Sequence, residues 1–196
     1  TDGRFTFLAG NGLESLKGGT QADGFAIDTD NPYNVNDTFD GGAGFDTFYL
    51  LSLSNYTFSF GADTIHNIER VMLTASAPSA AHLVMSDGSV AAGQTLTVDA
   101  GTLDATSSLN LDASAETNGG FAITGGAGDD TVTFSSSTVL AASTFDGGAG
   151  SDTLVLDGNF NVNFSAGTIV NVETIEMAAG HSYTLNLADG NIAASH

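Results

Sequence analysis

The chain has 196 residues, of which 41% are hydrophobic, and it carries 23 acidic residues against three basic ones, for a formal net charge of −20. This hydrophobic content is enough to build a core, but the lack of any cluster of lysines and arginines argues against binding to nucleic acid or to anionic membranes. There is no cysteine, which excludes disulfides, thiolate metal sites and cysteine nucleophiles.

The acidic excess matters because few groups in the chain can neutralise it. Crowded carboxylates repel one another in a compact state unless they stay in water or bind external cations. Calcium is the expected cation, because its ligands in proteins are carboxylate and carbonyl oxygens. The alternative is a solvated acidic surface that only keeps the chain soluble.

The N-terminal region begins without a recognisable leader. Residues 1–10 lack the basic and then apolar pattern of a secretory signal peptide, and no run of residues is long and apolar enough to span a bilayer. Export is therefore expected to use another signal.

Two nine-residue segments follow in register: AGNGLESLK at 9–17, with Glu14 in the acidic place, and GGTQADGFA at 18–26, with Asp23.

An acidic stretch, DTDNPYNVND, occupies residues 28–37. It places Asp28, Asp30, Asn31 and Asp37 close together in a predicted loop, loosely like a calcium loop. It lacks the glycine and the terminal glutamate of an EF-hand at their required spacing. We therefore interpret it as a polar insertion, with a calcium loop as the alternative.

A longer segment then repeats, since TFDGGAGFDTFYL at 38–50 returns as TFDGGAGSDTLVL at 144–156. Within these segments and once more between them, the nonapeptide G-G-x-G-x-D-x-U-x occurs in full, where U is a large apolar residue. The copies are GGAGFDTFY at 41–49, GGAGDDTVT at 125–133 and GGAGSDTLV at 147–155. Such self-similarity is typical of solenoids.

The repeat extends beyond the nonapeptides. Residues 56–73 align with 160–177, and 82–92 align with 182–194. The sequence therefore predicts a first module at 1–124 and a second, incomplete copy at 125–196, together forming one continuous solenoid. Because the second copy stops where the first continues, we expect the chain to be a segment of a longer tandem array.

Short alternating segments fill the space between the repeats, and their apolar residues recur about once every dozen positions. Alternation of apolar residues with Thr, Ser or Asn, bounded by Gly, Asp and Asn, predicts short β-strands and tight turns. The predicted fold is all-β, a right-handed parallel β-roll or β-helix, with a chain of sandwiches as the alternative. The apolar pairs are Val71/Leu73, Leu83/Met85, Leu96/Val98, Leu109/Leu111, Phe121/Ile123 and Val132/Phe134.

The nonapeptide has a physical logic of its own. Glycines allow backbone conformations with positive φ that turn carbonyl oxygens inward, while the aspartate supplies a hard anionic oxygen. The following x-U-x is a short strand whose apolar residue, Phe48, Val132 or Leu154, packs inside the roll. Oxygen-only ligation favours calcium.

The three full nonapeptides resemble the haemolysin-type, or RTX, calcium-binding repeats of proteins exported by bacterial type I secretion. The resemblance covers about a quarter of the chain and implies that each calcium lies between loops of successive coils, ideally two nonapeptides apart. The loops that begin at 18 and 41, and those that begin at 125 and 147, are further apart than that. Each pair would therefore flank one coil with an insertion of four or five residues.

The resemblance also implies the ligands. It gives side-chain roles to four aspartates and carbonyl roles to the loops at 41–44, 125–128 and 147–150. Glu14 is a further candidate, and Asp40, Asp129 and Asp146 beside the loops either bind the ion or, as we favour, face solvent. The implied calcium ligands are Asp23, Gly41, Ala43, Asp46, Gly125, Ala127, Asp130, Gly147, Ala149 and Asp152.

Two further steps, NIE at 67–69 and NVE at 171–173, occupy equivalent places in the two modules. We interpret them as turns between strands, in which Asn67 and Asn171 bond backbone groups inside the bend. A carbohydrate site at these steps is the alternative.

No enzyme motif is present in the sequence. The four histidines occur singly, without H-E-x-x-H or a paired zinc spacing, and no G-x-S-x-G elbow occurs. Paired carboxylates carry little information in so acidic a chain. We expect no catalytic activity.

The sequence therefore predicts a calcium-binding structural repeat of a large secreted bacterial surface protein: an adhesin, biofilm-matrix or S-layer component that folds on calcium outside the cell. Its expected partners are calcium, neighbouring modules of the same protein and cell-surface polysaccharide. One alternative is the secretion-assisting tail of an exported hydrolase. Another is a glycan-binding module that uses Tyr33, Tyr56 or Tyr183.

Overall fold

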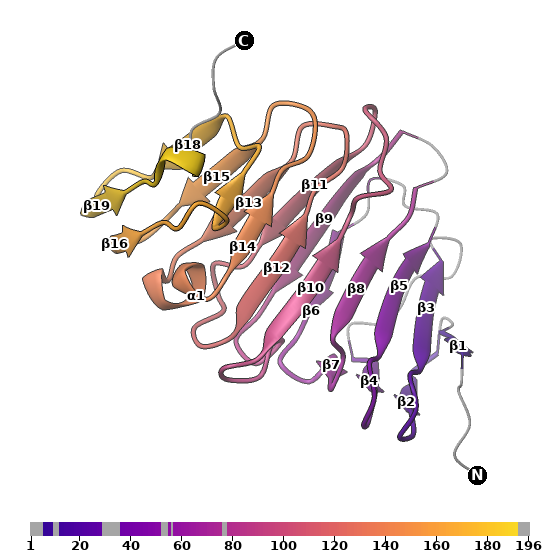
Figure 1. Ribbon diagram of the computed structural model, residues 1–196. Helices are drawn as coiled ribbons and strands as arrows, with labels where there is room; N and C mark the ends of the chain where they lie inside the picture. Colours follow the sequence, from indigo (N-terminus) through magenta and orange to yellow (C-terminus); the bar gives the residue numbers. More distant parts are fainter. Residues whose placement is uncertain are drawn as a thin grey trace.

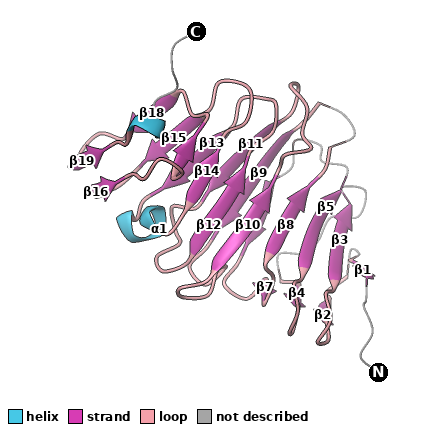
Figure 2. Cartoon of the chain, viewed as in Figure 1, coloured by secondary structure: helices cyan, strands magenta, loops and turns pink. Residues whose placement is uncertain are grey.

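The computed structural model describes residues 6–9, 12–28, 36–51, 55, 57–75 and 78–191. Short strands joined by turns make up most of this part of the chain, with one α-helix, α1 (Ser137–Ala141), and one 3-10 turn, η1 (Asp189–Asn191) (Figures 1 and 2). No helix among the described residues is long and apolar enough to cross a membrane. The strands are β1 (Thr6–Leu8), β2 (Ser15–Lys17), β3 (Gly24–Asp28), β4 (Thr38–Asp40), β5 (Thr47–Leu51), β6 (Thr57–Phe60), β7 (Ile65–His66), β8 (Arg70–Leu73), β9 (Ala80–Met85), β10 (Thr95–Asp99), β11 (Ser108–Asp112), β12 (Gly120–Thr124), β13 (Thr131–Phe134), β14 (Thr144–Asp146), β15 (Thr153–Leu156), β16 (Phe160–Asn163), β17 (Ile169–Val170), β18 (Thr174–Met177) and β19 (Tyr183–Asn186).

The strands stack as a parallel β-solenoid of about seven turns, which confirms the predicted fold class. An eight-stranded sheet has the order β1-β3-β5-β8-β10-β12-β14-β17, and a six-stranded sheet has the order β6-β9-β11-β13-β15-β18. A three-stranded sheet, β2-β4-β7, adds a face near the N-terminus, and a two-stranded sheet, β16-β19, adds one near the C-terminus. The eight-stranded sheet continues across the predicted module boundary between residues 124 and 125, because β12, which ends at Thr124, lies between β10 and β14 (Figure 1).

Strand register sets the length of each coil. Thr6 pairs with Gly24, which lies two nonapeptide lengths further along the chain. Phe48 pairs with Val71 and Leu154 pairs with Ile175, and both of these steps are longer. Most coils therefore exceed the two nonapeptides that the resemblance implies.

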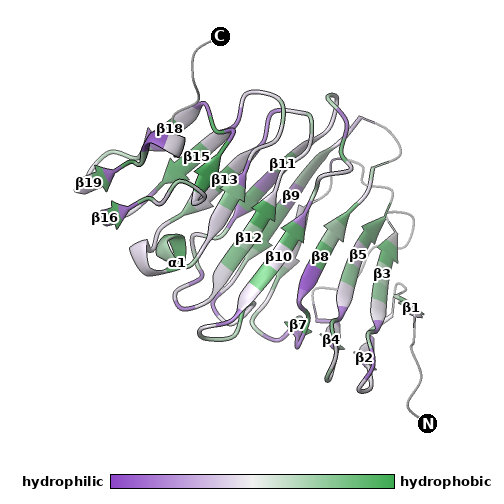
Figure 3. Cartoon of the chain, viewed as in Figure 1, coloured by the Kyte–Doolittle hydropathy of each residue, from purple (hydrophilic) through white to green (hydrophobic). Residues whose placement is uncertain are grey.

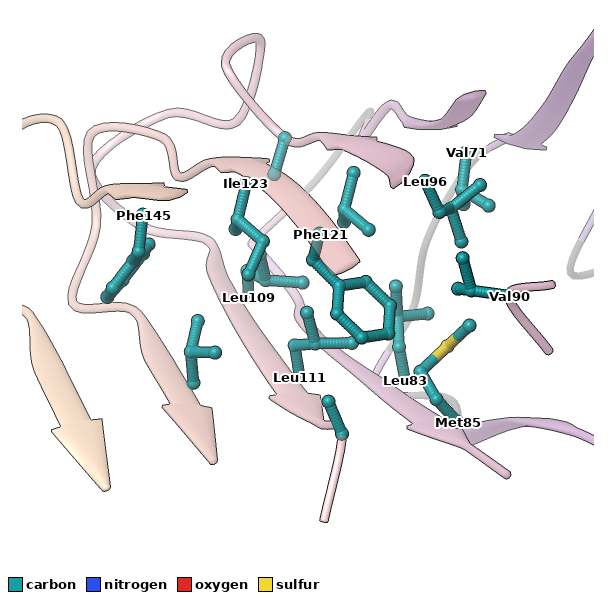
Figure 4. Close-up of a cluster of buried hydrophobic side chains, with 14 of the residues drawn as sticks. Val71, Leu83, Met85, Val90, Leu96, Leu109, Leu111, Phe121, Ile123 and Phe145 are labelled. Carbon is teal, nitrogen blue, oxygen red and sulfur yellow. The ribbon is translucent and has the colours of Figure 1, made fainter. Parts of the chain in front are cut away.

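The core lies inside the coils and consists of the apolar residue of each alternation. All twelve residues of the predicted apolar pairs are buried, none more than 2% exposed, and Figure 3 shows the alternation as green positions along the strands. Near the N-terminus, Phe48 meets Phe39 edge-on with ring centroids 4.9 Å apart and Phe60 at 5.7 Å. In the middle coils, Leu109, Leu111, Phe121 and Ile123 belong to one cluster of buried side chains (Figure 4). Each coil thus presents one apolar layer to the next.

The two modules are offset by one face of the solenoid. The repeated segment TFD is β4 in the three-stranded sheet, but its counterpart β14 lies in the eight-stranded sheet. Likewise β5 lies in the eight-stranded sheet and its counterpart β15 in the six-stranded sheet. The coils between them carry only two strands, since β9 leads to β10 through a turn without a strand. The glycine loops of the two modules therefore occupy different corners.

Candidate functional site

The glycine-rich loops form two stacked pairs, each at one corner. In the first pair, the Ala43 N–H donates to the Gly19 carbonyl at 2.9 Å, so loop 41–46 lies directly on loop 18–23. In the second, the Ala149 N–H donates to the Gly126 carbonyl at 3.1 Å, so loop 147–152 lies on loop 125–130. Each pair spans one coil.

Acidic side chains link these loops into two ladders. In the first ladder, the N–H of Asp23 donates to Oδ1 of Asp46 at 2.6 Å, and the N–H of Asp46 donates to Oε2 of Glu69 at 2.7 Å. The second ladder has the same order.

In that second ladder, the N–H of Asp130 donates to Oδ1 of Asp152 at 2.8 Å, and the N–H of Asp152 donates to Oε2 of Glu173 at 2.8 Å. Glu69 and Glu173 belong to the NIE and NVE steps and were not among the predicted ligands. Sequence spacing could have identified Glu69 as a member of the ladder, because the interval from Asp46 to Glu69 equals the interval from Asp23 to Asp46.

The aspartates of both ladders are buried, with Asp46, Asp130 and Asp152 at 0% exposure and Asp23 at 3%. Burial raises the pKa of Asp46 and of Asp130 above the usual carboxyl value. Burial also raises the pKa of Asp152 to about 6, with repulsion from neighbouring carboxylates adding to the effect. Desolvation disfavours the charged form of a carboxyl group, so these charges are costly without a counterion.

The two loops of each pair differ at the second oxygen of the aspartate. We call loops 18–23 and 125–130 the lower loops, and loops 41–46 and 147–152 the upper loops. In the lower loops, Oδ2 of Asp23 accepts the Gly19 N–H at 2.6 Å, and Oδ2 of Asp130 accepts the Gly126 N–H at 2.7 Å. In the upper loops, Oδ2 of Asp46 and Oδ2 of Asp152 are buried without a hydrogen-bond partner. Each pair therefore leaves one carboxylate oxygen unsatisfied.

The backbone explains this difference. Gly42 and Gly148, which correspond to Gly19 and Gly126, have φ of 93° and 98°, a region that favours glycine. The N–H of Gly42 consequently turns to Oδ1 of Asp40 at 3.1 Å and does not reach Asp46.

The first glycine of each upper loop is required by close packing. A Cβ on Gly41 would lie 2.1 Å from the carbonyl oxygen of Asn67 and 2.5 Å from Oδ2 of Asp46. A Cβ on Gly147 would lie 2.2 Å from the Asn171 carbonyl oxygen and 2.4 Å from Oδ2 of Asp152. In both places a carboxylate oxygen and a carbonyl oxygen converge on the same side of a glycine.

The N-x-E turns are held by their asparagines. Asn67 and Asn171 both have φ of 50°, the left-handed region that asparagine tolerates. Their side-chain amides donate to Oδ1 of Asp40 and of Asp146, both at 2.8 Å, rather than to backbone groups as the sequence suggested.

The flanking acidic residues have partners of their own. Asp40 pairs with Lys17, and this hydrogen bond and that from Asn67 hold the pKa of Asp40 below its usual value. Asp129 accepts the Ser151 N–H at 2.8 Å.

Two earlier candidates lie near the N-terminal coils. Glu14 donates its N–H to Asp37 at 2.9 Å, and its Oε2 is buried without a partner. Asp30 and Asn31 of the acidic stretch lie outside the described residues. The structure therefore places Glu14 beside one end of that stretch.

A cavity of about 330 Å³ adjoins the end of the first ladder. It lies where β7 ends the three-stranded sheet, and Asp40, Asn67 and Glu69 are among the residues that line it. Because Asn67 and His66 are exposed, this cavity gives solvent and ions a route to the ladder.

The donor set at each ladder consists of carboxylate and carbonyl oxygens. No cluster of three or more His, Cys, Asp or Glu side chains with metal-binding geometry occurs in the described part of the chain. A bound metal would therefore take most of its ligands from backbone carbonyls and the rest from one or two carboxylates. Such a set fits calcium better than a transition metal, and the unpartnered oxygens of Asp46 and Asp152 are the atoms that fit it best.

The tyrosines considered for glycan stacking give no exposed platform within the described residues. Tyr183 is half-buried, stacks on Phe160 with centroids 6.2 Å apart, and donates its hydroxyl to the Leu156 carbonyl. Tyr33 and Tyr56 lie outside the described residues.

Comparison of the chain with protein-family models, with curated proteins and with solved structures gave no match.

Proposed function

We propose that this chain is a calcium-binding structural repeat of a secreted bacterial surface protein and that calcium completes its fold. The observation that carries the proposal is the pair of buried, unpartnered carboxylate oxygens on Asp46 and Asp152, each at the top of a stack of glycine loops. A buried carboxylate without a donor is costly. A divalent cation removes that cost.

The charge balance supports the same function. With 23 acidic and three basic residues, the chain cannot neutralise itself, and the ladder aspartates accept hydrogen bonds from backbone N–H groups, which carry no full positive charge. Extracellular calcium modules have Kd values of roughly 10⁻⁴ to 10⁻³ M. At calcium 100 times Kd, each independent site adds about 2.7 kcal/mol to stability, which decides folding for a marginal domain.

The resemblance of the nonapeptides to RTX repeats supports the cellular setting. A chain that folds only at extracellular calcium levels crosses a type I secretion channel unfolded and folds outside the cell. The stack of coils then acts as a rigid spacer, since one eight-stranded sheet runs from β1 to β17. Such a spacer would suit a structural role in an adhesin, a biofilm matrix or an S-layer.

The test is a calcium titration of the purified chain, from excess chelator to about 10 mM, a range set by the Kd values of extracellular modules, with magnesium as control. We expect β-type circular dichroism and cooperative melting to appear with calcium and not with magnesium, because magnesium demands tighter octahedral geometry. A chelated chain that is already fully folded, and whose melting temperature calcium does not change, would refute the proposal.

A further inference from the structure

Each ladder contains two kinds of contact between coils. The lower junction joins the two glycine loops of a pair, and the upper junction joins the upper glycine loop to the N-x-E turn. Between stacked glycine loops, the second oxygen of the aspartate already has a donor, as Asp130 Oδ2 has in the Gly126 N–H. Between the upper glycine loop and the N-x-E turn, the second oxygen of Asp46 or Asp152 has none. The two kinds of junction therefore have different needs for a cation.

At the upper junction two acceptors face each other. Oδ2 of Asp46 and the Asn67 carbonyl oxygen both lie within 2.5 Å of the point where a Cβ on Gly41 would sit. Neither a carboxylate nor a carbonyl oxygen supplies a hydrogen, so the pair repels until a donor or a cation joins it.

A carboxylate oxygen and a carbonyl oxygen also converge at the lower glycines Gly18 and Gly125, but there Oδ2 of the aspartate already accepts an N–H group. The arrangement without a donor therefore occurs twice, at corners that are not equivalent in the fold. Oδ2 of Asp152 and the Asn171 carbonyl oxygen converge at Gly147 in the same way, although this loop joins the eight-stranded to the six-stranded sheet rather than the three-stranded to the eight-stranded sheet. The two corners therefore share the N-x-E turn on the next coil and not the surrounding sheets.

The N-x-E turn also brings a second carboxylate. Glu69 accepts the Asp46 N–H through Oε2, and Glu173 does the same for Asp152. Each upper junction thus combines two carboxylates with a carbonyl oxygen. The two negative charges of the carboxylates match the charge of one divalent cation. Glu69 also lines the cavity through which an ion can approach.

We infer that the chain binds two calcium ions, one between Asp46 and the Asn67–Glu69 turn and one between Asp152 and the Asn171–Glu173 turn, and none between paired glycine loops. This inference rests on the proposed function and changes where its sites lie. The lower aspartates then act in the hydrogen-bonding of the stack, and the N-x-E turn becomes half of each metal site.

The first experiment measures bound calcium by equilibrium dialysis and elemental analysis for the wild type, Asp46→Asn, Asp152→Asn and the double variant. We expect two ions in the wild type, one in each single variant and none in the double variant. An asparagine amide can donate to the facing carbonyl oxygen of Asn67 or Asn171, so the single variants should also melt at a higher temperature than the wild type in chelator.

Asp130→Asn is the matched control. Both oxygens of Asp130 accept N–H groups, from Leu109 at 2.7 Å and from Gly126 at 2.7 Å, so an asparagine loses one of these bonds. This variant should be less stable with and without calcium and still bind two ions. If Asp130→Asn loses an ion while Asp46→Asn and Asp152→Asn keep both, the ions lie between glycine loops; the inference is then wrong and the proposed function stands.

A second measurement locates the ions without any substitution. Replacing calcium by a paramagnetic lanthanide in the wild type should broaden the amide resonances of Asn67–Glu69 and Asn171–Glu173 more than those of Gly18–Gly19 and Gly125–Gly126. Stronger broadening at the lower glycines overturns the inference. A wild type that binds neither calcium nor lanthanide defeats the proposed function itself.

Discussion

The backbone N–H of Asp130 donates to Oδ1 of Asp152 on the next coil at 2.8 Å, while the side chain of Asp130 accepts the N–H of Leu109 at 2.7 Å. Each buried aspartate therefore connects one coil with its neighbour. Hydrogen bonds of this charge-assisted kind are stronger than neutral ones. The ladder fixes the register of the glycine loops even though most of its members are candidate metal ligands.

The first prediction concerns the leading glycine of the upper loops. Gly147→Ala places a methyl group against the Asn171 carbonyl oxygen, a backbone atom that cannot turn aside. We expect a loss of about 1–3 kcal/mol in the free energy of unfolding, typical of overpacking, measured by denaturant unfolding at saturating calcium.

Gly167→Ala is the control for that substitution. A Cβ at Gly167 meets nothing within 4 Å, and its φ lies outside the left-handed region. We expect no loss of stability, or a gain of up to about 1 kcal/mol from the reduced freedom of the unfolded chain. Equal losses in both variants would show that close packing at Gly147 has no special role.

The second prediction concerns two phenylalanines of the same repeat. Phe48 is fully buried between Phe39 and Phe60, so Phe48→Ala should cost about 3–5 kcal/mol. Phe45 is 54% exposed and contacts the Arg70 guanidinium at 5.9 Å from the ring centroid, so Phe45→Ala should cost no more than about 1 kcal/mol. Urea unfolding of both variants at saturating calcium checks the difference, and similar midpoints would contradict it.

The strands and their inward faces were predictable because the pattern is local. Alternation selects Leu96 and Val98, or Leu109 and Leu111, as core residues, and the repeat of 38–50 at 144–156 requires the same local structure twice. The corner that each module occupies was not predictable. It depends on whether a turn such as 86–94 holds a strand, and that turn carries no alternation to decide it.

The lack of a hydrogen-bond donor to Oδ2 of Asp46 and of Asp152 could not be predicted from the sequence either. The loops at 125–130 and 147–152 share the letters GGAG, yet Gly126 donates to its aspartate and Gly148 has φ of 98°. The difference arises from what lies on the next coil, a second glycine loop in one case and the Asn171 turn in the other. Sequence spacing places these loops near one another but does not give the direction of an N–H.

The third prediction concerns Glu116, a buried glutamate outside both ladders. Its Oε1 accepts the N–H groups of Thr117, Asn118 and Gly119 at 3.0–3.1 Å, and its Oε2 accepts the Val90 N–H at 3.2 Å. In Glu116→Gln the amide nitrogen cannot accept, so one N–H loses its partner at a cost of about 1–3 kcal/mol.

The control is Glu176→Gln on β18, where the side chain is exposed and the change should stay within about 0.5 kcal/mol. Thermal unfolding at two calcium concentrations checks both variants. The Glu116→Gln loss should be the same at each concentration, because this residue lies in neither ladder; a loss that vanishes with calcium would assign Glu116 to a metal site.

The last prediction is the pH dependence of the calcium-free chain. The pKa of Asp152 is raised to about 6 in the fold, and those of Asp46 and Asp130 are raised as well, all mainly by burial. A carboxyl group whose pKa is higher in the folded than in the unfolded chain binds its proton more tightly when folded. The stability it contributes is complete below the unfolded pKa of 3.8 and is lost as the pH rises through about 6.

In chelator we therefore expect the melting temperature to fall between pH 4 and pH 7, the window set by these pKa values. Asp40 and Asp104, whose pKa values are lowered, act in the opposite direction but only below the usual carboxyl range. Calcium binds the deprotonated carboxylates, so saturating calcium should remove this fall or reverse it. Differential scanning calorimetry at both conditions checks the prediction, and a chelated chain whose melting temperature rises from pH 4 to pH 7 would show that the ladder carboxylates are already compensated without an ion.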